Sequence, residues 1–103
     1  MVTIPEHTRV SLNNYVCNGI PTGSFLRAVL SNDLFEAFAR ADSINAANMS
    51  KIVTFVYAYV PRCCYGNEAT VNEWLRLHRK EPEKTHQAVK LYQSRLDNDA
   101  LIV

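Results

Sequence analysis

The residues best suited to bind a ligand begin at a glycine-containing turn. Residues 18–24 read Asn-Gly-Ile-Pro-Thr-Gly-Ser, and an apolar helical pattern follows them. A helix N-terminus presents unpaired N–H groups and partial positive charge, so it favours an anion such as phosphate. The turn contains neither the GxxxxGK[ST] motif of a P-loop nor the GxGxxG motif of a dinucleotide-binding fold. It is therefore either a plain connection between helices or an anion site without a standard motif.

Polar side chains downstream of this turn extend the candidate site. Asn32, Asp33 and Asn45 offer the fixed donors and acceptors that recognition of a nucleobase needs. Arg27 and Arg40 carry the planar guanidinium that suits phosphate oxygens. Each of these residues also has a structural explanation, as a helix cap or as a solvated surface residue. The predicted ligand-binding residues are Thr22, Gly23, Ser24, Arg27, Asn32, Asp33, Arg40 and Asn45.

Tyrosines and a further arginine form a second set of candidates. Tyr57, Tyr59 and Tyr65 could stack on a base, although Tyr59 follows the spacing of core residues. The first two-thirds of the chain carry few charges, and Arg62 is one of the few arginines there. Its guanidinium could bind a phosphate group. The structural alternative is packing for the tyrosines and solvent exposure for the arginine.

The sequence carries no signature of catalysis or of metal binding. Cys63 and Cys64 are adjacent, and no CxxC pair or suitably spaced histidine accompanies them, which argues against a zinc site. A nucleophile pair of one of these cysteines with His78 lacks an acid and an oxyanion element. We therefore expect no enzymatic activity, no metal and no cofactor.

Length, net charge and cysteine number limit the class of protein to which this chain can belong. The chain has 103 residues, 48% of them hydrophobic, and a formal net charge of +1. This length fits one domain covering residues 1–103, and the near-neutral charge predicts no nucleic-acid partner. Three cysteines, an odd number, favour a reducing compartment. The N-terminus lacks a signal sequence and the apolar runs are short, so we expect a cytoplasmic protein without membrane contact.

Hydrophobic periodicity predicts the helices that hold these residues. Residues 52–57 also fit a strand, but no second strand-like run exists to pair with them. We therefore expect an all-α fold, a compact bundle of four to five short helices. The expected helices span residues 5–18 with Gly19 as C-cap, 24–42 with Ser24 as N-cap, 43–60 with Asp42-Ser43 as N-cap, a fourth that begins after Asn67 as N-cap, and a charged fifth at about 82–97. Asn32-Asp33 are good N-cap residues, which leaves open whether the second helix is continuous or breaks and restarts there.

The first two-thirds of the chain contain more large aromatic side chains than one small core encloses. Aromatic residues left over from the core are commonly covered by another subunit. The excess therefore predicts a symmetric homo-oligomer. The aromatic residues concerned are Phe25, Phe35, Phe38, Phe55, Tyr57 and Tyr59.

One stretch resembles a known group of proteins. Residues 20–34 read IPTGSFLRAVLSNDL, and Ala41-Asp42, Asn45, Ile52-Val53 and the turn 61–66 follow. In these features, over about residues 4–78, the chain resembles a family of small, uncharacterised tailed-phage proteins. The resemblance implies a phage origin and no assigned chemistry. The charged helix at 82–97 lies outside it.

Phage origin implies a class of function, because small phage proteins of this kind often counter host defence. The leading expectation is a protein of the infected host's cytoplasm that sequesters a small nucleotide-derived immune signal, of the cyclic oligonucleotide or ADP-ribose type, without turnover. The alternative is an inhibitor that binds a host enzyme or defence complex through an apolar helix face. An aromatic patch that stays exposed in the oligomer favours the protein partner, and a closed polar cavity favours the small ligand.

Overall fold

The first helix begins and ends where the sequence predicts. The computed structural model describes the backbone of residues 2–102 and the side chains of residues 2–99. Helix α1 spans Glu6–Asn18 and begins directly after Pro5. Gly19 ends it with φ of 66°, in the left-handed region that glycine adopts without strain. The backbone N–H of Gly19 donates to the Tyr15 carbonyl at 3.1 Å, which satisfies one of the last free carbonyls of the helix.

Residues 24–42, for which the sequence left open a continuous helix or one broken at 32–33, form two helices. Helix α2 spans Ser24–Leu30 and α3 spans Leu34–Arg40. Asn32 between them has φ of 61°, a conformation that asparagine tolerates better than most residues. The Asp33 carboxylate accepts the Glu36 N–H at 3.2 Å and caps α3. The N-cap of α2 is Gly23, one residue before the expected Ser24.

The predicted helix over residues 43–60 is also divided. Helix α4 spans Ser43–Ala47, and α5 spans Met49–Tyr59. The Asp42 carboxylate accepts the Asn45 N–H at 2.7 Å and caps α4, as expected. Residues 52–57 lie within α5, so the helix interpretation is confirmed and the strand alternative is wrong.

The C-terminal third follows the predicted order with two short 3-10 helices added. Helix η1 spans Arg62–Cys64, α6 spans Glu68–Lys80, η2 spans Pro82–Thr85 and α7 spans His86–Ile102. Asn67 caps α6 by accepting the Thr70 N–H at 2.8 Å. The all-α class is confirmed for the described residues, which contain seven α-helices and no strand. The expected count of four to five is wrong, because the chain breaks its helices near residues 32 and 48.

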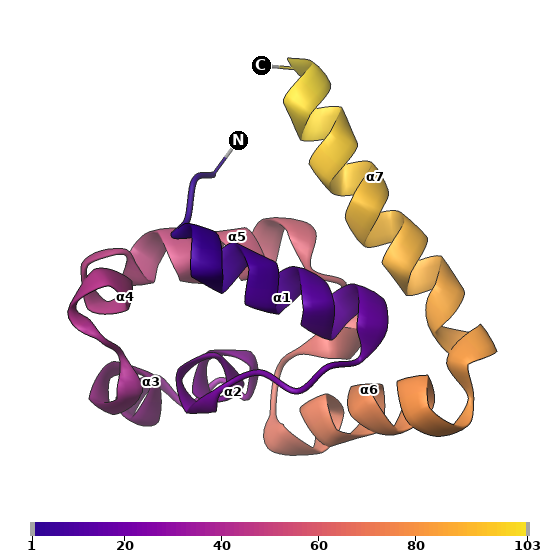
Figure 1. Ribbon diagram of the computed structural model, residues 1–103, viewed down its shortest axis with the longest axis horizontal. Coiled ribbons are helices and arrows are strands. Elements are labelled where there is room, and N and C mark those ends of the chain that lie inside the picture. The colour runs from indigo at the N-terminus through magenta and orange to yellow at the C-terminus, as the bar shows by residue number, and fades with distance from the viewer. Residues whose placement is uncertain (1, 103) are drawn as a thin grey trace.

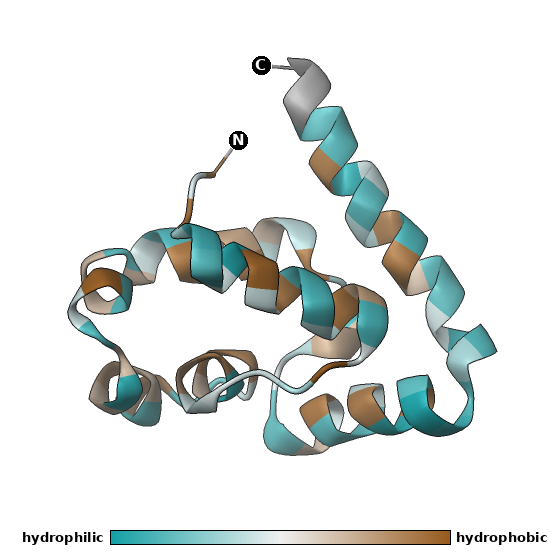
Figure 2. Cartoon of the chain, viewed as in Figure 1, coloured by the Kyte–Doolittle hydropathy of each residue, from teal (hydrophilic) through white to brown (hydrophobic). Residues whose placement is uncertain are grey.

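The helices are arranged around one core (Figure 1). In Figure 1, α1 crosses in front of α5. Helices α3, α2 and α6 follow one another along the lower edge, and α7 rises along the right side. The radius of gyration is 13.1 Å, close to the roughly 13 Å of a compact chain of this length. Figure 2 shows the hydrophobic residues concentrated on the inward sides of the helices. The largest fully buried side chains are Trp74, Tyr15, Tyr92, Phe55, Leu12, Leu30 and Ile52.

Hydrogen bonds from buried aromatic residues fasten the C-terminal half to α1. The Trp74 indole N–H donates to the Tyr15 carbonyl at 3.1 Å. The Tyr15 hydroxyl donates to the Cys64 carbonyl at 2.7 Å, and burial raises the pKa of Tyr15 above its ordinary value. These bonds satisfy polar atoms that would be costly to bury alone. They fix η1 beside α1 and thereby set the position of one end of the groove described next.

Candidate functional site

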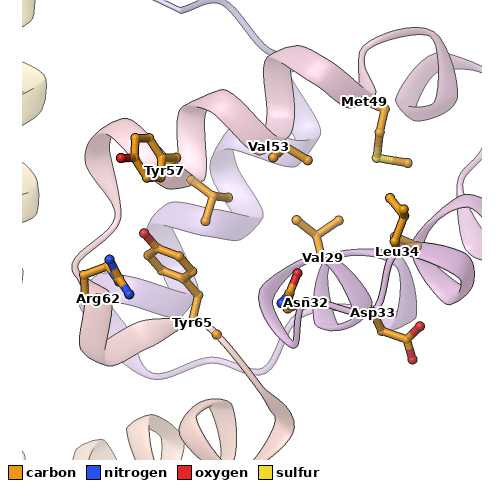
Figure 3. A pocket seen from close by; sticks show the side chains of 12 residues that line it. Val29, Asn32, Asp33, Leu34, Met49, Val53, Tyr57, Arg62 and Tyr65 are labelled. Carbon is orange, nitrogen blue, oxygen red and sulfur yellow. The ribbon is translucent and has the colours of Figure 1, made fainter.

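An open groove of about 440 Å³ lies between the α2–α3 pair and helix α5 (Figure 3). The break between α2 and α3 places the last turn of one helix and the first turn of the next along the same wall. At one end, the Gly66 N–H donates to the Leu30 carbonyl at 2.8 Å, which ties the loop after η1 to the end of α2. The lining residues are Val29, Asn32, Asp33, Leu34, Ala37, Met49, Val53, Val56, Tyr57, Arg62, Tyr65 and Gly66.

One end of the groove combines two aromatic rings with a guanidinium. Figure 3 shows Tyr57 from α5 across from Tyr65, with Arg62 beside them. The Arg62 guanidinium carbon lies 5.8 Å from the centre of the Tyr65 ring, within the range of a cation–π contact. Tyr57 is 75% exposed. Among the described residues, no carboxylate forms an ion pair with Arg62. Its charge is therefore available to an anion.

The other end of the groove is apolar. Met49 and Val53 from α5 face Leu34 from α3, and Val29 lies between the two ends (Figure 3). Leu34 is 60% exposed, so this part of the groove is open to solvent. The Asn32 side chain lies near the middle of the groove in Figure 3 and supplies an amide donor and acceptor there.

Only two of the residues predicted as ligand-binding, Asn32 and Asp33, line this groove. Gly23, Ser24 and Arg40 line a separate hollow of about 320 Å³ between α1, α2 and α4. A third hollow of about 260 Å³, beside α2, α3 and the first residue of α6, brings Ser24, Arg27, Asp33 and Arg40 together. The structure therefore distributes the predicted set over three hollows around α2 and α3.

Asn45 also lines that separate hollow, and its side chain has a structural contact. The buried Thr8 hydroxyl donates to Asn45 Oδ1 at 2.7 Å, which joins α1 to α4. His7 Nε2 lies 3.9 Å from Asp42 at the edge of the same hollow. Helix α2, which begins here, has only seven residues. The hollow thus contains the expected polar groups, several of which are already occupied by contacts that hold the fold.

The predicted arginines are engaged in surface contacts. Arg27 donates to Asn72 Oδ1 at 2.6 Å and forms an ion pair with Glu68 at 3.4 Å. Arg40 forms an ion pair with Glu36, one turn earlier on α3, at 2.6 Å. Such exposed pairs are weak, so a strongly bound anion could still displace them.

Thr22 has only a local contact among those described. Its hydroxyl donates to the Gly23 carbonyl at 3.2 Å, and the residue lines neither the groove nor the hollow beside α1. The turn at residues 18–24 therefore has the conformation expected of a connection between helices, with Gly19 ending α1 and Gly23 preceding α2.

The two adjacent cysteines differ strongly in environment. Cys64 is buried, whereas Cys63 is exposed, and their sulfur atoms lie 4.0 Å apart. The hydrogen bond from Cys64 lowers the pKa of Cys63 to about 7, and the same contact together with burial raises the pKa of Cys64. Cys63 lines a different hollow, beside Lys84 and Lys90, and does not line the groove. Within the described part of the chain, no group of three or more His, Cys, Asp or Glu side chains could hold a metal ion.

Three residues of the second set of candidates, Tyr57, Arg62 and Tyr65, line the groove, whereas sequence reasoning left out its apolar walls, such as Val53. The buried stripe of α5 consists of Met49, Ile52, Phe55, Val56 and Tyr59. Val53 and Tyr57 are also apolar or aromatic, but they lie off this stripe and four residues apart. Two such residues form a second apolar strip on a helix and could have indicated the groove. Tyr59, in contrast, is buried, which confirms its interpretation as a core residue.

Comparison with known proteins gave no relatives. No family model matches the chain, and no curated protein and no solved structure is significantly similar to it. Within the described residues, no helix is both long enough and apolar enough to cross a membrane.

Proposed function

We propose that the protein binds a small planar anion in the groove between α2–α3 and α5 and holds it without chemical turnover. The observation that supports this most directly is the end of the groove where Tyr57, Tyr65 and Arg62 meet. Aromatic rings stack on any nucleobase, because every base has a π-face. A guanidinium without an ion-pair partner among the described residues provides a contact for phosphate oxygens.

The dimensions and lining of the groove suit a nucleotide-derived ligand. Its volume of about 440 Å³ lies within the range of roughly 300–1,000 Å³ typical of small-molecule sites. Apolar walls from Val29 and Val53 would receive the base, and the Asn32 amide offers both a donor and an acceptor to its edge. The ligand class is therefore the one expected from the sequence, a cyclic oligonucleotide or an ADP-ribose derivative, and the proposed setting remains the cytoplasm of an infected host.

Titration calorimetry with cyclic dinucleotides, cyclic trinucleotides and ADP-ribose tests this proposal. Arg62→Gln should weaken binding about 10- to 150-fold, which corresponds to the roughly 1.5–3 kcal/mol of a charge-assisted hydrogen bond. Arg79→Gln is the matched control, because Arg79 is exposed and lies on α6 away from the groove. Arg40→Ala distinguishes binding in the groove from binding in the hollow beside α1, because Arg40 lines that hollow and does not line the groove. Loss of binding in Arg40→Ala together with unchanged binding in Arg62→Gln would place the ligand at the turn before α2 and overturn the groove as its site.

A second candidate function is inhibition of a host enzyme or defence complex by direct protein binding. The observation that favours it is the exposure of Phe35 and Phe38 on α3, at 88% and 53%. Aromatic residues exposed together on one helix commonly form a protein interface. This function requires that the face stays open in solution and that the chain binds no small ligand. The experiment in the next subsection measures the first of these requirements.

A further inference from the structure

Helix α3 is apolar around most of its circumference although it lies at the surface. Ala37 faces the core and is 3% exposed, whereas Phe35 is 88% exposed. At about 100° per residue, Leu34, Phe38 and Phe35 form a continuous arc that starts beside Ala37 and turns towards solvent. A helix that is apolar nearly all round is normally buried. The arc therefore lacks a covering element within the described chain.

The groove lies directly beside this arc, since Leu34 belongs to both. A projecting ridge next to a groove on the same face is self-complementary, because a two-fold axis places the ridge of each copy in the groove of the other. We propose that a second copy of this chain covers α3 in a two-fold symmetric dimer. Phe35 and Phe38 of each protomer then lie over the apolar end of the partner's groove, next to Met49 and Leu34.

The exposed apolar area is sufficient for such a dimer. The large apolar side chains exposed on and beside α3 present on the order of 500 Å² together, given 150–250 Å² for a fully exposed aromatic side chain. A standard interface removes about 800 Å² from each partner, of which roughly 60% is apolar. The two areas agree. The residues counted are Leu34, Phe35, Phe38 and Ile44, which are 53% to 88% exposed.

The distribution of polar groups fits the same arrangement. The remaining side of α3 carries Glu36 and Arg40, which pair with each other at 2.6 Å and can stay in solvent at the edge of the interface. The end of the groove with Tyr57 and Arg62 lies away from the apolar end (Figure 3), so it stays free for a ligand. This inference rests on the proposed function in one respect: the second copy closes the apolar end of the groove, and the end with Tyr57 and Arg62 stays open to the ligand.

Sedimentation velocity over a series of protein concentrations tests the dimer. The wild-type chain should sediment with the mass of two chains, and Phe35→Asp, at a position that is 88% exposed, should sediment as one. Leu91→Asp is the matched control, because Leu91 is an exposed apolar residue on α7, on the opposite side of the molecule (Figure 1). It should remain dimeric. Phe38→Asp provides a second variant of the same face, and circular dichroism verifies that each variant is folded.

Two results would overturn the dimer. One is a wild-type chain that stays monomeric at every concentration, and the other is a folded Phe35→Asp variant that dimerises as well as Leu91→Asp. Arg62→Gln, measured for mass and for ligand, separates this inference from the proposed function. Arg62→Gln should stay dimeric and bind the ligand more weakly. A wild-type dimer that binds no ligand contradicts the function alone, whereas a wild-type monomer that still binds a ligand contradicts the dimer alone.

Discussion

Replacing Gly19 with alanine should destabilise the fold strongly, for two reasons that the structure specifies. Gly19 has φ of +66°, where an L side chain costs about 1–2 kcal/mol. An added Cβ would also lie 2.5 Å from the His78 Cγ and closer still to the His78 Cβ. Overpacking of this kind typically costs about 1–3 kcal/mol. We therefore expect Gly19→Ala to lower the free energy of unfolding by about 2–5 kcal/mol, and the melting temperature by roughly 10 °C or more.

Thermal and urea unfolding followed by circular dichroism measure this change. Gly23→Ala is the matched control, because Gly23 has φ of −69° and nothing within 4 Å of an added Cβ. Its effect should stay within about 1 kcal/mol of zero. In the double variant Gly19→Ala/His78→Gly both the Cβ and the ring of His78 are absent and the clash is removed, so the two substitutions should couple favourably by about 1 kcal/mol or more. Equal stability of Gly19→Ala and Gly23→Ala, or strict additivity in the double variant, would refute this reasoning.

Two further predictions concern a thiol and a helix cap. With its pKa lowered to about 7, Cys63 gains thiolate as the pH rises through 7, so its alkylation by iodoacetamide should reach half its maximal rate near that pH. Cys64→Ala should raise the midpoint, because it removes the thiol that hydrogen-bonds to Cys63; an unmoved midpoint would exclude that bond as the cause. Asp42→Ala should lower the free energy of unfolding by about 1 kcal/mol, because it removes the carboxylate that accepts the hydrogen bond of the Asn45 N–H. The melting temperature should fall by roughly 4–8 °C. Asp97→Ala, at an exposed position of α7, should leave the melting temperature nearly unchanged. An equal loss of melting temperature in the two variants would argue against a capping role of Asp42.

Local sequence signals predicted much of the helical framework. Gly19 as a C-cap and Asp33, Asp42 and Asn67 as N-caps all have the predicted roles, because each depends on contacts within a few residues. The division at Asn48 was not predicted. The backbone there turns without a glycine or a proline, so the local sequence carries no strong signal for a break.

The groove was less predictable, because its walls come from distant parts of the chain. Val29 of α2 and Val53 of α5 lie on its two sides. One end depends on the backbone hydrogen bond from the Gly66 N–H to the Leu30 carbonyl. Periodicity assigns a residue to one side of its own helix, but it does not say which helix packs against that side. The predicted polar residues were accordingly treated as one site, whereas the structure distributes them over three hollows, one of which brings Ser24, Arg27, Asp33 and Arg40 together.

We propose above all that this chain holds a small nucleotide-derived anion intact in the groove. Native mass spectrometry of the wild-type protein, incubated with cyclic dinucleotides, cyclic trinucleotides and ADP-ribose, tests it most directly, because the bound mass identifies both the ligand and any turnover. We predict retention of one compound with its mass unchanged, and loss of that adduct in Arg62→Gln but not in Arg79→Gln. A protein that retains none of these compounds, or that releases a compound of altered mass, would contradict the claim.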